Sequence, residues 1–178
     1  MMPSKKLSRF SLAALLLAVA LVLPFLTLQL RQLGNALCPM HLPVLLCGFF
    51  CGPWYGLAVG FAAPLLRFAL FGLPPVIPIG IAMSFELAAY GFVSGALYRL
   101  LPKKKANIYI SLVSAMLVGR AVWGAVRVVL YGLGKSEFGW AAFLAGAFTN
   151  AIPGIILQLV LIPILVSAMK KAFPEWDQ

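Results

Sequence analysis

Long apolar runs separated by short polar segments make up almost the whole chain. About 20 helical residues cross the hydrocarbon core of a bilayer, so each long run is a candidate membrane span. The pattern therefore predicts an all-α membrane protein with one integral membrane domain over residues 1–178. Four runs are long enough to cross as single helices: 10–30, 79–101, 108–133 and 141–169.

The first apolar run follows a basic leader, MMPSKKLSRF, which is also how a secretory signal peptide begins. The run continues to Leu30, however, and no small-residue cleavage pattern follows it. A signal peptide has a shorter apolar core than this. We therefore expect the segment to stay in the protein as a membrane anchor.

The region 36–74 fits either one long span or two short ones, and the basic residues decide between them. Loops rich in Lys and Arg lie on the cytoplasmic side of a membrane. The N-terminus is basic, and so is the loop after Leu101, so an even number of spans separates them. We predict two short helices, 40–52 and 56–71, with a turn at 53–55. The chain then has six transmembrane helices, and both termini are cytoplasmic.

Composition agrees with a multi-pass membrane protein. The chain is 63% hydrophobic and only 10% charged, whereas a soluble domain is about half apolar and about a quarter charged. The formal net charge is +10, but the basic residues do not gather on one polar face, so a nucleic-acid partner is not expected. The three cysteines lie in apolar sequence and predict no disulfide framework.

Four ionisable side chains fall inside the predicted spans. Charges within a bilayer are costly, and by default they indicate a functional site. A rise of about 1.5 Å per residue places all four between the middle of the bilayer and its outer surface. They are Arg67, Glu86, Arg120 and Arg127.

The fifth predicted helix combines two of these charges with aromatic residues. Helix positions spaced by three, four and seven residues share one face. Arg120, Trp123, Arg127 and Tyr131 have this spacing, and Gly124 lies among them. A face with cations, aromatic rings and room for close approach is typical of a wall that contacts a ligand.

Three cations and one acid leave a positive excess, which indicates an anionic or partly anionic ligand. For two of the arginines a purely structural role stays open. Arg127 would extend to the outer headgroups, and Arg120 would only neutralise Glu86. Asn150 lies level with Glu86 in the last helix and either contacts the ligand or joins helices. His41, at the outer start of the second helix, is a further candidate contact.

Four glycines recur at every fourth position across the two short predicted helices, and Pro53 interrupts their repeat. Small residues at this spacing let helices approach closely. We therefore expect two short helix contacts of this type, one on each side of the proline. The glycines are Gly48, Gly52, Gly56 and Gly60.

Catalysis is not expected from this sequence. It contains neither Gly-x-Ser-x-Gly nor His-Glu-x-x-His, and it has no phosphate-binding loop. No cofactor or metal site is predicted either. Two classes of function remain: a substrate-binding subunit of a transporter, and a self-contained carrier coupled to protons or sodium through Glu86. An ion channel fits less well.

Three segments resemble the S components of energy-coupling factor (ECF) vitamin transporters: MHLPVLLCGFFCGPWYGL, FGLPPVIP and SFELAAYGFVSGALYRLLPKK. The size and the six spans fit the same family. The resemblance implies a membrane subunit that binds a vitamin or related micronutrient from outside. It also implies an energy-coupling transmembrane protein and two ABC-type ATPases as partners.

In that family, small residues spaced Ala-x-x-x-Ala on the first helix contact the coupling protein, and LAALLLAVA supplies Ala14 and Ala18. The arginines favour a vitamin with a carboxylate or a phosphate. Pantothenate is the first candidate, ahead of niacin, lipoate and folate-like compounds. A self-contained carrier often has two similar halves with matching helix breaks, and this sequence has no such duplication.

Overall fold

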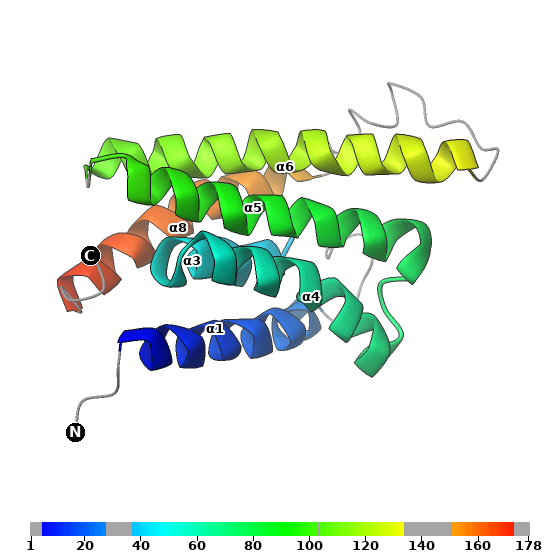
Figure 1. Ribbon diagram of the computed structural model, residues 1–178, viewed down its shortest axis with the longest axis horizontal. Coiled ribbons are helices and arrows are strands. Elements are labelled where there is room, and N and C mark those ends of the chain that lie inside the picture. Colours follow the sequence, from blue (N-terminus) through cyan, green and yellow to red (C-terminus); the bar gives the residue numbers. More distant parts are fainter. Residues whose placement is uncertain (1–4, 28–36, 103, 134–150, 173–178) are drawn as a thin grey trace.

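The computed structural model describes residues 5–27, 37–102, 104–133 and 151–172. All the regular elements in these residues are helical (Figure 1), which confirms the all-α class. Five helices are long and apolar enough to cross a membrane, and α3 is a shorter apolar helix. The elements are α1 (Lys5–Val22), η1 (Leu23–Thr27), α3 (His41–Cys51), α4 (Pro53–Phe71), η2 (Val76–Gly80), α5 (Ile81–Leu100), α6 (Lys105–Leu133) and α8 (Ile152–Ala172).

The two helices predicted within 36–74 are both present, but they are unequal. Helix α3 has 11 residues, which is about 16 Å at the usual rise and only half of a bilayer core. Helix α4 has 19 residues and reaches full span length. The predicted turn at 53–55 is wrong, because α4 already begins at Pro53.

One residue is enough for the break between α3 and α4. Gly52 has φ 105°, a conformation that other residues rarely adopt, and it reverses the chain without a loop. Pro53 follows at the first helical position, where a proline suits the helix start because its missing N–H needs no partner there. Trp54 and Tyr55 therefore lie in the first turn of α4.

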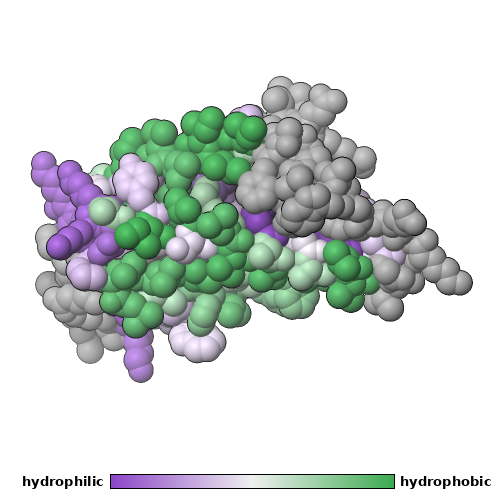
Figure 2. Space-filling view, turned by 90° about the horizontal axis from the view of Figure 1, so that it is seen from above, coloured by the Kyte–Doolittle hydropathy of each residue, from purple (hydrophilic) through white to green (hydrophobic). Residues whose placement is uncertain are grey.

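The basic segments lie at one end of the molecule. The start of α1, the connection from α5 to α6 and the end of α8 share the left end in Figure 1. The break after α3 is at this end too, because Nη2 of Arg99, near the end of α5, donates to the Cys51 carbonyl at 2.9 Å. Figure 2 shows hydrophilic residues gathered at the same end, beside a broad apolar surface.

Glycines bring α3 and α4 against α5, as expected from their spacing. A Cβ on Gly48 or on Gly56 would collide with the backbone of Gly91 on α5, and one on Gly60 would collide with the backbone of Leu87. Such contacts are available only to residues without a side chain. Gly52 is different, because it forms the helix break.

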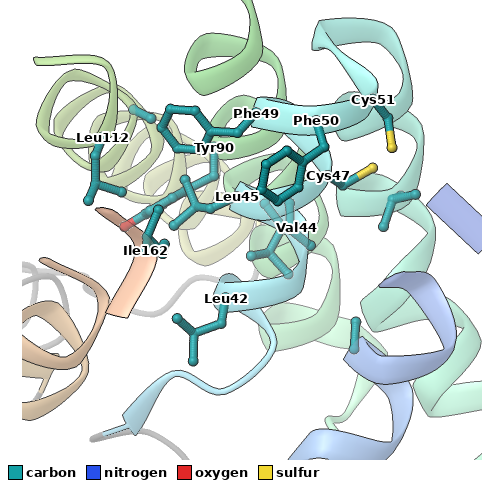
Figure 3. Packing of buried hydrophobic residues seen from close by; sticks show 14 of the residues in the cluster. Leu42, Val44, Leu45, Cys47, Phe49, Phe50, Cys51, Tyr90, Leu112 and Ile162 are labelled. Atoms are coloured by element: carbon teal, nitrogen blue, oxygen red, sulfur yellow. The ribbon is translucent and has the colours of Figure 1, made fainter. Parts of the chain in front are cut away.

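Apolar side chains of α1, α3, α4, α5, α6 and α8 fill the space between these helices, and Figure 3 shows part of this core. Tyr90 of α5 reaches into this space and is 1% exposed. The members of the core include Val44, Leu45, Phe49, Tyr90, Leu112 and Ile162.

Candidate ligand-binding site

A buried ion pair joins α5 to α6. Nη1 of Arg120 lies 2.7 Å from Oε1 of Glu86, and the two residues are only 6% and 1% exposed. A buried charge is tolerated only when it is paired and hydrogen-bonded. The pair therefore balances the charge of the acid with that of one of the three cations that the sequence places within spans.

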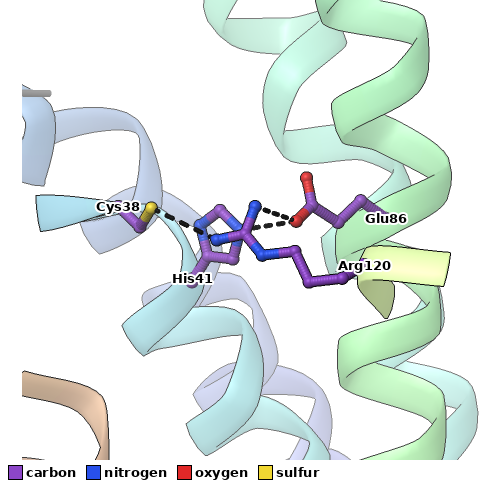
Figure 4. Close-up of polar contacts among 4 residues, drawn as sticks. All are labelled: Cys38, His41, Glu86 and Arg120. Carbon is purple, nitrogen blue, oxygen red and sulfur yellow. Dashed lines mark hydrogen bonds and ion pairs between the residues drawn. The ribbon is translucent and has the colours of Figure 1, made fainter. Parts of the chain in front are cut away.

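His41 brings α3 to the same acid. It is the first residue of α3 and is 3% exposed. Its Nε2 lies 3.4 Å from Oε1 of Glu86, the oxygen that also pairs with Arg120 (Figure 4). Three helices that are distant in the sequence thus meet at one carboxylate oxygen. We call Glu86, Arg120 and His41 the charged cluster.

Cys38 adds a thiol to the charged cluster. Nη2 of Arg120 donates to its Sγ at 3.7 Å (Figure 4). Cys38 has φ 47°, in the left-handed region, and its carbonyl accepts a 3.0 Å hydrogen bond from the backbone N–H of His41. This tight turn leads directly into α3, so the thiol and the imidazole are positioned together.

Tyr90 of α5 packs against His41. It lies one helical turn after Glu86, and its ring packs edge-on against the imidazole with 5.0 Å between the ring centroids. A Cβ on Gly119 would collide with the ring of Tyr90. Glycine at 119 therefore makes the room that the tyrosine needs beside Arg120.

The arginine-bearing face of α6 points into the protein. Arg120 and Trp123 are 6% and 9% exposed, whereas Val128 and Val129 on the other side are 57% and 60% exposed. Because α6 passes alongside α5, this orientation directs the predicted face toward the charged cluster. The helical spacing alone indicated that these residues share a face.

Arg127 is held by aromatic neighbours on its own helix. Its guanidinium carbon lies 5.1 Å from the ring centroid of Trp123 and 4.8 Å from that of Tyr131. Its Nη2 also donates to the Tyr131 hydroxyl at 3.2 Å. Cation–π contacts of this kind orient a guanidinium over the rings.

Arg67 lies in a different place. Its Nη1 donates to the carbonyl of Leu21, near the end of α1, and its guanidinium lies 5.0 Å and 5.6 Å from the ring centroids of Phe25 and Phe71. These contacts tie the last turns of α1 and α4 together. In the part of the chain that the structure describes, none of them joins Arg67 to the charged cluster. Asn150 lies outside the described residues.

Two nitrogen atoms of the charged cluster have no hydrogen-bond partner within the described residues: Nδ1 of His41 and Nε of Arg120. Buried polar atoms are nearly always hydrogen-bonded, and exceptions require an explanation. A bound polar molecule would supply one. The chemistry that this cluster offers is recognition by hydrogen bonds and charge.

Sequence reasoning missed Cys38, Tyr90 and Gly119. Tyr90 had a usable pattern, because a residue four positions after Glu86 lies on the same face of the helix. Gly119 directly precedes Arg120. A glycine inside a membrane helix often marks a place where that helix packs closely against a neighbour. Nothing in the local sequence around Cys38 indicates that its thiol meets an arginine of α6.

The small residues predicted to contact a partner lie on the outside of α1. Ala14 and Ala18 are exposed, whereas Ala13 and Ala20 are 4% and 0% exposed. Helix α1 therefore packs against the bundle with one small-residue face and presents another outward. Ala14 and Ala18 lie one turn apart on the outward face, and small residues at this spacing allow a second helix to approach.

The chain matches the model of a known family. The family described as "ECF transporter, substrate-specific component" matches residues 9–166, which cover most of the chain and all the helices of the charged cluster. Comparison with curated proteins and with solved structures gives no further match. The family is that of integral membrane subunits that bind the substrate of a transporter, as the resemblance implied. On the length of this match, the chain belongs to the substrate-specific components of ECF transporters.

Proposed function

We propose that this chain captures a vitamin or related micronutrient from outside the cell, for ATP-driven uptake, and binds it against the charged cluster. The observation that carries the proposal is the pair of buried nitrogen atoms, Nδ1 of His41 and Nε of Arg120, that no described residue satisfies. In a substrate-specific component, buried hydrogen-bonding groups without partners are best explained by the substrate. Trp123, Arg127 and Tyr131 extend the site along α6.

The first candidate substrate is pantothenate, which combines a carboxylate with an amide and hydroxyl groups. It can use both the charge of Arg127 and the hydrogen-bonding groups of the charged cluster. Niacin, lipoate and folate-like compounds are the comparison set, because each carries a carboxylate on a different framework. Asn150 stays a proposed contact from the last helix.

A thermal-shift screen of the purified protein tests the proposal. A ligand that binds only the folded state at 100 times its Kd adds about 2.7 kcal/mol of stability. We expect pantothenate to raise the melting temperature clearly and in a concentration-dependent way, and the other vitamins to raise it less. No shift with any vitamin of the set would contradict the proposed function.

We propose that the basic end of the molecule is cytoplasmic, because loops rich in Lys and Arg stay inside. Single cysteines at 54 and 72, in a variant without the native cysteines, test this orientation. A membrane-impermeant maleimide should label position 72 from outside, and position 54 only after the membrane is opened. Labelling of position 54 in intact cells would reverse the orientation.

We also propose that Ala14 and Ala18 contact the energy-coupling transmembrane protein, which works with two ABC-type ATPases. Their exposure on α1 supports this role. The alternative, a self-contained carrier, needs a carboxylate that exchanges protons or ions. Glu86 suits that task poorly, because it is buried against Arg120, whose charge is permanent.

A further inference from the structure

We propose that the seam between α4 and α5 binds one anionic phospholipid, with the headgroup phosphate at Arg99 and an acyl chain along a row of aromatic rings. The site is at the basic end of the molecule, about 20 Å along α5 from Glu86. The lipid site is therefore separate from the ligand-binding site, and it does not depend on the proposed function.

Two aromatic pairs lie along this seam. Helices α4 and α5 run side by side (Figure 1), and glycines bring their backbones into contact. Trp54 of α4 packs edge-on against Phe92 of α5 with 5.4 Å between the ring centroids, and Phe61 packs in the same way against Phe85 at 5.5 Å. Trp54, Phe61 and Phe85 are 72%, 39% and 45% exposed. The pairs thus present a continuous aromatic surface toward the membrane.

Arg99 continues the same line on α5. Phe85, Phe92 and Arg99 follow one another at intervals of seven residues, which keeps them on one face of the helix. At a rise of about 1.5 Å per residue, the two rings lie about 10 Å and about 21 Å from Arg99. One leaflet of a bilayer contains about 15 Å of hydrocarbon. The row therefore covers the depth of one leaflet, with the cation at its surface end.

The helix break positions Arg99 and leaves it charged. Its Nη2 donates to the Cys51 carbonyl at 2.9 Å, and a Cβ on Gly52 would collide with the guanidinium. The side chain is exposed, and a guanidinium has five N–H donors, of which a carbonyl occupies one. Among the described residues the one carboxylate is that of Glu86, which pairs with Arg120.

Charge and position together indicate the occupant. Hydrophilic residues gather at this end beside a broad apolar surface (Figure 2), and basic segments of this kind attract anionic lipid headgroups. Tryptophan is enriched at the same level of a membrane. The planar fork of Arg99 matches two phosphate oxygens. A phospholipid offers that phosphate and an apolar chain together, whereas a free phosphate would leave the aromatic row uncovered.

Native mass spectrometry of the purified full-length protein measures this binding. The probes are phosphatidylglycerol and a diacylglycerol with the same acyl chains, which lacks the phosphate. The wild-type protein should hold one phosphatidylglycerol about 10- to 100-fold more tightly than the diacylglycerol, the range expected for one charge-assisted contact. Inorganic phosphate at the same concentration should not displace the lipid, because it makes no contact with the rings.

Three variants locate the site. Arg99→Gln should remove most of the preference for phosphatidylglycerol. Trp54→Ala changes no charge, and it should weaken the binding of both lipids by a similar factor. The double variant Lys104→Gln with Lys105→Gln is the control, because it removes two exposed positive charges at the start of α6 and none from the seam. This control should keep the preference. Thermal unfolding checks that each variant is folded.

Several outcomes would overturn the lipid site. A control that loses as much preference as Arg99→Gln would mean that only the general positive charge of this end attracts the lipid. Displacement by inorganic phosphate would indicate a simple anion site. If Arg99→Gln keeps its lipid but no longer co-purifies with the coupling protein, the seam is a protein contact. Vitamin binding should be unchanged in all three variants, so failure of the lipid site leaves the proposed function standing.

Discussion

Replacing Arg120 by methionine should abolish measurable pantothenate binding and should also destabilise the protein. The substitution removes a hydrogen-bonding arm of the charged cluster and leaves Glu86 buried without its 2.7 Å partner. Breaking a buried ion pair on one side costs about 3–5 kcal/mol. We expect an affinity loss of at least about 100-fold, from the stranded acid together with the lost contact. Calorimetry and thermal unfolding in detergent measure the two effects.

A second variant separates folding from recognition. In the double variant Glu86→Gln with Arg120→Met, no charge is left unpaired in the cluster, and replacing both partners of a buried pair is often nearly neutral. The double variant should therefore unfold at a temperature close to that of the wild type. It should still fail to bind pantothenate. Wild-type affinity in either variant would mean that the site lies elsewhere.

Leucine at both Ala14 and Ala18 should prevent the chain from binding its energy-coupling protein without disturbing the ligand-binding site. The two alanines are exposed and one turn apart on α1, so the added bulk would prevent another helix from approaching. The double variant should no longer co-purify with the coupling protein and the ATPases, and cells should not accumulate the vitamin. Its free energy of unfolding should change by no more than about 0.5 kcal/mol, as is usual for exposed positions, and its ligand affinity should stay close to the wild-type value.

The chain provides a matched control for this experiment. Ala121 and Ala125 are also exposed and four residues apart, but they lie on α6. Leucine at both should leave co-purification and uptake intact. If the α6 pair disrupts the complex and the α1 pair does not, the partner surface is on α6 and the role proposed for Ala14 and Ala18 is wrong.

The same variants distinguish a binding subunit from a self-contained carrier. The purified chain alone, in liposomes with a proton or sodium gradient, should bind the vitamin but not concentrate it. Uptake against a gradient that is unaffected by leucine at 14 and 18 would favour the carrier, with Glu86 as its coupling site.

Local pattern alone determined the class of protein and most of its helices. Apolar runs predicted where most helices lie, and Pro53 predicted that a break occurs next to it, because these features depend on neighbours within one or two turns. The break itself lies at Gly52, not in the predicted turn at 53–55. The basic segments predicted which helix ends lie together. Spacing along α6 predicted that Arg120 and Arg127 share a face, since the 3.6-residue period is a property of the helix itself.

Only the tertiary structure decided which of these charges meet. His41 lies 45 residues from Glu86, and Cys38 lies 82 residues from Arg120. Arg67 was expected beside them, and it bonds instead to the Leu21 carbonyl, 46 residues away.

The physical reason is that contacts between helices depend on how each helix is rotated and how closely it packs. Here that packing is set by Gly56 against Gly91 and by Gly119 against Tyr90. Helical periodicity says which residues share a face. It does not say which neighbouring helix that face will meet, or at what depth.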